Sequence, residues 1–110
     1  MFHVEQQGAV EIVACGVALN ADNAEELKET VQSRLLHQPQ FVLDFTDVSV
    51  VDSSGLEALL DVQDQVEGLG GAVKLAVVGR LCEDALRITG VGRRFEKFDT
   101  IKAAVGSFSR

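Results

Sequence analysis

Two adjacent serines, Ser53 and Ser54, are the residues of this chain best placed to do chemistry. They follow the apolar pair Val50-Val51 and Asp52, and they precede Gly55 and a stretch of helical periodicity. This order places both hydroxyls where a strand ends and a helix begins. The first N–H groups of a helix have no backbone acceptors, and together with the helix dipole they favour an anion. A serine there can accept a phosphoryl group and change the local charge in one step, so the sequence indicates a switch rather than a catalyst.

The same serines also have a purely structural interpretation. Ser54 and Glu57 have the spacing of a capping box, in which the serine accepts a hydrogen bond from the first turn and the glutamate reaches back. A capping serine stabilises a helix by about 1 kcal/mol and needs no further role. With Ser54 as the cap, Ser53 lies one residue earlier and its hydroxyl is the freer of the two.

A hydrolase that acts through Ser53 is a weaker alternative. The esterase turn has the pattern Gly-x-Ser-x-Gly, whereas here Asp52 precedes Ser53 and only Gly55 follows. A nucleophilic serine also needs a base, and the two histidines, His3 and His37, have no spacing that favours a triad.

Glycine-rich segments elsewhere in the chain predict turns rather than ligand sites. The run 68–71 (Gly-Leu-Gly-Gly) follows a predicted helix and precedes a strand, which is the wrong order for a phosphate-binding loop. The segment 90–94 (Gly-Val-Gly-Arg-Arg) is a weak phosphate candidate and favours a turn. The carboxylates lack calcium-loop spacing, and Cys15 and Cys82 lack metal-ligand spacing. We therefore expect no catalytic residue, no cofactor and no metal, so a phosphoryl group must come from another enzyme.

The charge is unevenly distributed over the 110 residues, whose formal net charge is −7. Residues 1–70 hold 13 acidic and 2 basic side chains, whereas residues 71–110 hold 4 acidic and 8 basic ones. An acidic chain without Trp or Tyr is poorly suited to nucleic acid, so we expect no direct nucleic-acid binding. The acidic part favours a basic protein partner. The basic residues near the end form either a local patch or solvated faces: Arg80, Arg87, Arg93, Arg94 and Lys97.

The chain shows no targeting signal. Its first residues lack the basic start and apolar run of a signal peptide, and no apolar run approaches the roughly 20 residues of a membrane helix. We therefore predict one cytoplasmic domain over residues 1–110, without membrane insertion, whose two cysteines are reduced and buried.

Apolar runs alternate with segments of helical periodicity along the chain. Strands are predicted at 2–5, 10–15, 41–43, 72–78 and 95–98, and helices at 20–36, from 56 to the glycines at 68–71, 81–89 and 100–108. Asn20 or Asp22 is expected to cap the first helix. The second helix is expected to bury Leu56, Leu59, Leu60, Val66 and Leu69. The order ββαβαβα(β)α predicts an α/β fold with a mixed, mostly parallel sheet of four or five strands and about four helices. Sites in such folds lie beyond the carboxyl ends of the strands, where residues 52–56 fall.

Taken together, these residues resemble the STAS domain of bacterial anti-sigma factor antagonists. The resemblance covers nearly the whole chain and is strongest over 41–56, where Asp-Ser-Ser-Gly-Leu follows an apolar strand. It continues through Gly70-Gly71 and through 86–91 (Leu-Arg-Ile-Thr-Gly-Val), which is similar to the family's short helix and its exit.

The resemblance implies a mechanism called partner switching. The unmodified antagonist binds an anti-sigma factor that is also a serine kinase, and so frees the sigma factor. Phosphorylation by that kinase ends the binding, and a serine phosphatase resets the protein. The resemblance assigns the phosphorylated residue to Ser53 and the partner-binding surface to Asn20, Asp52, Ser53, Ser54, Gly55 and Leu56.

One loop departs from the family pattern. Antagonists commonly carry Gly-x-Leu-Asp after the second strand, whereas this chain has Gly16-Val17-Ala18-Leu19-Asn20, one residue longer and with an amide in place of the acid. Asn20 keeps hydrogen bonding but lacks the charge. STAS domains also occur in stress-signalling assemblies, anion transporters and lipid-transport accessory proteins, so a non-switching interaction module is the alternative function.

Overall fold

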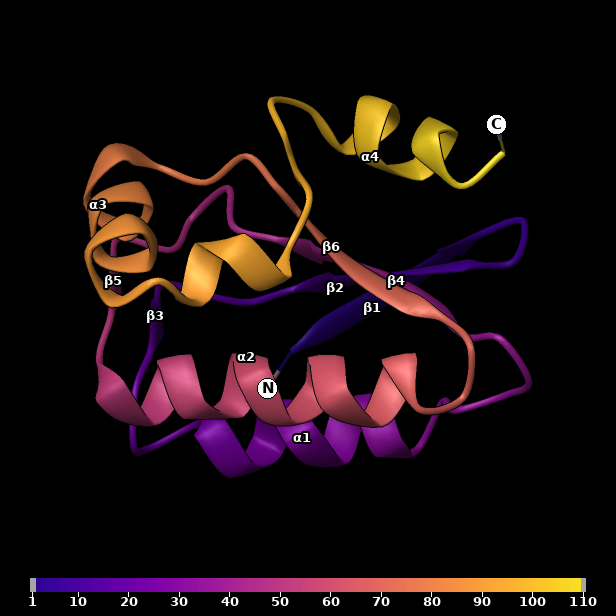
Figure 1. Cartoon of the computed structure of the whole chain (residues 1–110), viewed down its shortest axis with the longest axis horizontal. Coiled ribbons are helices and arrows are strands. Elements are labelled where there is room, and N and C mark those ends of the chain that lie inside the picture. Colours follow the sequence, from indigo (N-terminus) through magenta and orange to yellow (C-terminus); the bar gives the residue numbers. More distant parts are fainter. Residues whose placement is uncertain (1, 110) are drawn as a thin grey trace.

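A mixed five-stranded sheet forms the centre of the computed structural model, which describes residues 2–109 (Figure 1). Strands β1 (His3–Gln7) and β2 (Val10–Ala14) form an antiparallel hairpin at one edge. Three parallel strands continue the sheet beyond β2, in the order β4 (Gln40–Asp44), β6 (Ala72–Ala76) and β7 (Lys97–Phe98). The two central strands are nearly continuous apolar runs because both of their faces are covered.

Four helices surround this sheet. Helices α1 (Ala24–Gln32) and α2 (Ser53–Glu67) lie side by side on one face, and α4 (Ile101–Ser107) lies on the other (Figure 1). Helix α3 (Arg80–Thr89) packs at one end, followed by a short 3₁₀ helix, η1 (Val91–Arg94). The predicted α/β fold with a mixed, mostly parallel sheet and four helices is confirmed.

The period-2 alternation of the strands divides the core into two clusters. Val13, Leu43 and Leu75 face the larger cluster beneath α1 and α2, whereas Ile12 and Val42 face a smaller one beneath α4. Burial of each such leucine stabilises the fold by about 1.5–3 kcal/mol.

Several predicted boundaries are corrected by the structure. The first helix covers Ala24–Gln32 rather than 20–36, and its N-cap is Asn23 rather than Asn20 or Asp22, without a side-chain capping bond. The last strand is only Lys97–Phe98 rather than 95–98, because Phe95 is the C-cap of η1 and the chain pairs with β6 only from Lys97. Leu69 is 42% exposed, because α2 ends before it reaches the face on which the rest of the helix packs.

Two very short strands complete the fold, and the sequence predicts only the second of them, as the strand that ends before Asp52. Strand β3 (Ala18–Leu19) pairs in parallel with β5 (Val50–Val51) to form a separate two-stranded sheet. Two residues cannot display an alternating pattern, so β3 has no sequence signal, whereas β5 is the predicted strand end at the apolar pair Val50-Val51. This small sheet nevertheless brings the loop after β2 next to the start of α2.

Both cysteines are free and buried, as the sequence predicts. Burial raises the pKa of the Cys15 thiol, to which Asp44 adds, and burial also raises the pKa of Cys82. Within residues 2–109, no helix has both the length and the apolar character needed to cross a bilayer.

Candidate functional site

The candidate site is the junction between β5 and α2. Asp52 is the N-cap of α2, and its Oδ1 accepts a hydrogen bond of 3.0 Å from the Gly55 N–H. Its carbonyl oxygen accepts from the Leu56 N–H at 2.9 Å. The capping-box alternative with Ser54 as the cap is therefore wrong. Aspartate is as good an N-cap as serine, and here the helix starts two residues earlier than the capping box requires.

With Asp52 as the cap, neither serine hydroxyl is needed to cap the helix. Ser53 and Ser54 occupy the first two helical positions, where Ser53 is exposed and Ser54 is partly exposed. Within the described residues 2–109, neither hydroxyl makes a hydrogen bond, and neither backbone N–H of the two has an acceptor. The junction thus presents an accessible hydroxyl beside two free donors, an arrangement that favours an added negative charge.

Gly55 is fixed by the close approach of the β3 backbone. A Cβ added there would lie 2.5 Å from the carbonyl oxygen of Leu19 and 2.9 Å from its carbonyl carbon. The same carbonyl oxygen accepts from the Asp52 N–H at 3.0 Å. Only a residue without a side chain lets the strand and the first turn of α2 come this close.

Asn20 lies at the end of the adjoining loop and shapes that loop. Its Oδ1 accepts from the Asp22 N–H at 2.9 Å, and its own N–H donates to Oδ1 of Asn23 at 2.9 Å. Its carbonyl oxygen accepts from the Ala24 N–H at 2.9 Å. The backbone of the loop is thus held against Asp52 through Leu19, while the Asn20 amide is engaged within the turn rather than with Ser53.

Leu56 is the predicted partner-binding side chain that packs against the core, and Gly55 beside it is buried. Leu56 itself is half-buried against the larger core cluster. Two other apolar side chains at this end of the molecule are more exposed and were missed by sequence analysis: Val17 is 72% exposed and Val50 is 52% exposed. Val17 directly precedes β3, and the Ser49 N–H donates to its carbonyl oxygen at 2.9 Å. Both valines therefore belong to the small sheet that precedes the serine turn.

An acidic groove between α1 and α2 reaches the same turn. It has a volume of about 240 Å³ and includes Ser54 and Glu57 in its lining. Lys28 of α1 bridges the groove, with its Nζ 3.2 Å from Glu25 and 3.5 Å from Asp61 of α2. Hydrogen bonding to Glu25 is the main cause that raises the pKa of Lys28, and Asp61 contributes further. Three carboxylates and one ammonium line the groove, so it suits a basic partner.

Neither a triad partner bonded to Ser53 nor a metal cluster is found in the described part of the chain. Within residues 2–109, neither histidine hydrogen-bonds to Ser53, and no cluster of three His, Cys, Asp or Glu side chains could hold a metal ion. What the junction can do is accept a modification from outside.

The chain was compared with known families and structures. The STAS domain model matches residues 1–104. A comparison with curated protein sequences finds no match.

Solved structures with the same fold come from different kinds of protein. A candidate anti-sigma factor antagonist of Thermotoga maritima is 25% identical, with a TM-score of 0.90 over 99% of this chain and 95% of that one. A sulfate transporter family protein of Wolinella succinogenes is 24% identical, with a TM-score of 0.80 over 92% of this chain and 85% of that one.

The anti-sigma factor antagonist SpoIIAA has the same fold in two forms. Its unphosphorylated form is 16% identical, with a TM-score of 0.83 over 99% of this chain and 96% of that one. The phosphorylated form of this Bacillus protein, also 16% identical, has a TM-score of 0.74 over 98% of this chain and 99% of that one. With the STAS model spanning almost all of its length, this chain belongs to the STAS domain family.

Proposed function

We propose that this protein is a cytoplasmic anti-sigma factor antagonist that works by partner switching and is not itself an enzyme. Its unphosphorylated form binds an anti-sigma factor with serine kinase activity and releases the sigma factor. Phosphorylation of Ser53 ends this binding, and a serine phosphatase restores it. The observation that carries the proposal is the exposed Ser53 hydroxyl, free of hydrogen bonds within residues 2–109, at the first position of α2.

The electrostatics of the junction support this role. A phosphoserine adds about −1.5 to −2 charges at neutral pH. The free N–H groups at the start of α2 stabilise that charge within the folded domain. A partner surface that fits a neutral hydroxyl beside Asp52 meets a second, larger negative charge after modification. Local charge and bulk are therefore sufficient to end binding, and no refolding is required.

Mass spectrometry of the protein purified from its own host tests the modification. We expect a phosphorylated fraction whose modified peptide carries the phosphate on Ser53. In the matched variants, Ser53→Ala abolishes this fraction and Ser54→Ala leaves it in place. A phosphate on Ser54, or no phosphate under any growth condition, contradicts the proposal.

Binding to the host's anti-sigma kinase tests the switch. We expect Ser53→Ala to bind the kinase as the unmodified protein does, and Ser53→Asp to bind at least about tenfold more weakly, since an unpaired carboxylate buried beside Asp52 in a surface that fits a neutral hydroxyl costs several kcal/mol. Equal affinities of the two variants would argue against the switch.

A non-switching interaction module is the second candidate. The similarity to the Wolinella succinogenes transporter family protein favours it, because that fold is shared by proteins of a different kind. Such a module forms complexes of the same stability whatever the state of Ser53. A pulldown with phosphorylated and unphosphorylated protein as baits therefore separates the two candidates.

A further inference from the structure

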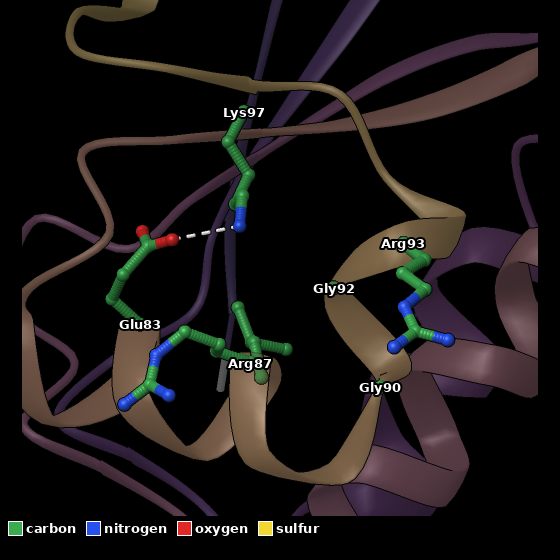
Figure 2. A pocket seen from close by; sticks show the side chains of 7 residues that line it. Glu83, Arg87, Gly90, Gly92, Arg93 and Lys97 are labelled. Carbon is green, nitrogen blue, oxygen red and sulfur yellow. Dashed lines mark hydrogen bonds and ion pairs between the residues drawn. The ribbon is translucent and has the colours of Figure 1, made fainter.

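A second hollow, unrelated to Ser53, lies where the end of α3 meets η1 and β7. Its volume is about 350 Å³, and its charged lining residues are Glu83, Arg87, Arg93 and Lys97 (Figure 2). This volume is typical of small-molecule sites. A docking site for a protein would instead be a wide surface, of about 800 Å² on each partner.

The lining of this hollow is positive in a chain that is otherwise acidic. Three cations and one carboxylate line it, although the formal net charge of the whole chain is −7. Figure 2 shows the Lys97 ammonium reaching toward Glu83, whereas Arg93 lies on the other side of Gly92, at the opposite rim of the hollow. Within residues 2–109, the Arg93 guanidinium has no ion pair. A cation without a counter-charge at the rim of a hollow is available to an anionic ligand.

The two other cations are held only by exposed ion pairs. Lys97 Nζ lies 2.7 Å from Glu83, and Arg87 Nη2 lies 3.4 Å from Asp84. Such pairs contribute about 0–1 kcal/mol. A ligand with two or more negative charges therefore competes for these cations at small cost. The position of Arg87 in the last turn of α3 is explained by the helix dipole alone, but the positions of Arg93 and Lys97 are not.

Two glycines keep the wall of the hollow free of side chains. Gly90 ends α3 with φ +80°, a conformation that favours glycine. A Cβ on Gly92 would lie 3.3 Å from Lys97 Nζ and 3.2 Å from Leu86 Cβ. The ammonium group thus lies directly over bare backbone, and a side chain at position 92 would encroach on it.

We propose that this hollow binds a small molecule bearing a phosphate group, whose oxygens pair with Arg93 and Lys97. Phosphate matches this lining because it carries close to two charges and accepts several hydrogen bonds, and arginine and lysine are the side chains that bind it. The site involves no residue of the serine turn, so its failure would leave the proposed switch untouched, and the reverse also holds.

Titration of ¹⁵N-labelled protein with phenyl phosphate at constant ionic strength tests the site. We expect saturable amide shifts at Gly90, Gly92 and Arg93. Inorganic phosphate as a second probe shows whether the phosphate group is sufficient or the organic part is needed. Shifts that rise without saturation, or that spread over every basic residue, would overturn the proposal, because they indicate screening rather than a site.

Three single variants give the titration its controls. Arg93→Gln is expected to weaken phenyl phosphate binding about tenfold, because it removes a charge-assisted hydrogen bond. Arg80→Gln removes an equally exposed arginine of α3 outside the hollow and should leave the affinity unchanged. Glu83→Gln removes the competing carboxylate and should tighten binding several-fold. Equal losses in the two arginine variants, or weaker binding with Glu83→Gln, would refute the assignment.

Discussion

Asp52 holds the first turn of α2 through its hydrogen bond from the Gly55 N–H. Asp52→Ala removes this bond, and we expect the free energy of unfolding in urea to fall by about 1 kcal/mol. Asp52→Asn keeps a capping oxygen, and asparagine caps as well as aspartate, so it should unfold close to the original protein. If Asp52→Asn were as unstable as Asp52→Ala, the charge rather than the hydrogen bond would be what stabilises the turn.

Gly55 and Gly106 give opposite predictions for the same substitution. Both lie in helices, but a Cβ at position 55 would meet the Leu19 carbonyl at 2.5 Å, whereas nothing lies within 4 Å at position 106. We expect Gly55→Ala to lower the free energy of unfolding by about 1–3 kcal/mol through overpacking. Gly106→Ala should raise it by about 0.5 kcal/mol, because alanine is the better helix former. Thermal and urea unfolding of both variants measure the two effects, and a stabilising Gly55→Ala would show that β3 moves away readily.

At the scale of the elements, one side chain replaces a missing strand. Strand β7 pairs only with Leu75 and Ala76, so Val73 of β6 has no strand partner on that side. The buried Gln63 of α2 takes this place: its Oε1 accepts from the Val73 N–H at 2.9 Å, and its Nε2 donates to the carbonyl oxygens of Val73 at 3.0 Å and Arg94 at 2.6 Å. Helix α2, strand β6 and η1 are thereby joined at one point.

Gln63→Met tests this junction with a side chain of similar length. The methionine leaves the backbone groups of Val73 and Arg94 without these partners, and a buried unpaired group costs about 1–3 kcal/mol. We therefore expect a loss of that size in the free energy of unfolding in urea. Faster hydrogen exchange at the Val73 amide, with the β1–β2 hairpin unaffected, should accompany it. An unchanged exchange rate at Val73 would mean that Gln63 is dispensable.

Most elements with a sequence signal are those long enough to show an apolar run or a period. The buried strands around Val42 and Leu75 were predicted from their continuous apolar runs, and the helix with Leu27 and Val31 on one face was predicted from its repeated period. Strand β3 and η1 are too short to show either. The strand–helix junction at the two serines was predicted correctly. Its N-cap was not, since Asp52 and Ser54 are both good N-caps and the local sequence does not distinguish them.

At the scale of the whole molecule, the acidic groove was missed and the basic patch was left as one of two alternatives, because both depend on residues from different elements. The acidic groove combines Glu25 and Lys28 of α1 with Asp61 of α2, and the positive hollow combines Arg93 with Lys97 and Glu83. The charge count shows an acidic first part and a basic last part, but not which side chains meet. The fold turns this asymmetry into two local surfaces of opposite sign, one beside the serine turn and one at the end of α3.

Phosphorylation of Ser53 should leave the architecture intact. The hydroxyl is exposed, so a phosphate needs no rearrangement of the core, and the start of α2 stabilises its charge. In amide spectra of the stoichiometrically phosphorylated protein, we expect large shifts only in the first turn of α2 and the neighbouring β3–β5 sheet. Helix α4 covers the other face of the sheet and β1 lies at its edge, so the amide signals of both should not shift (Figure 1).

The thermal stability of the phosphorylated protein also tests whether the fold stays intact. A favourable helix–phosphate interaction contributes about 0.3–1 kcal/mol at an exposed position, so the midpoint of thermal unfolding should change little and in the stabilising direction. Repulsion from Asp52 opposes this gain, and Asp52→Asn should therefore enlarge it. Shifts that extend into α4, together with a clear loss of stability, would mean that the switch works by loosening the fold rather than by changing the surface that a partner meets.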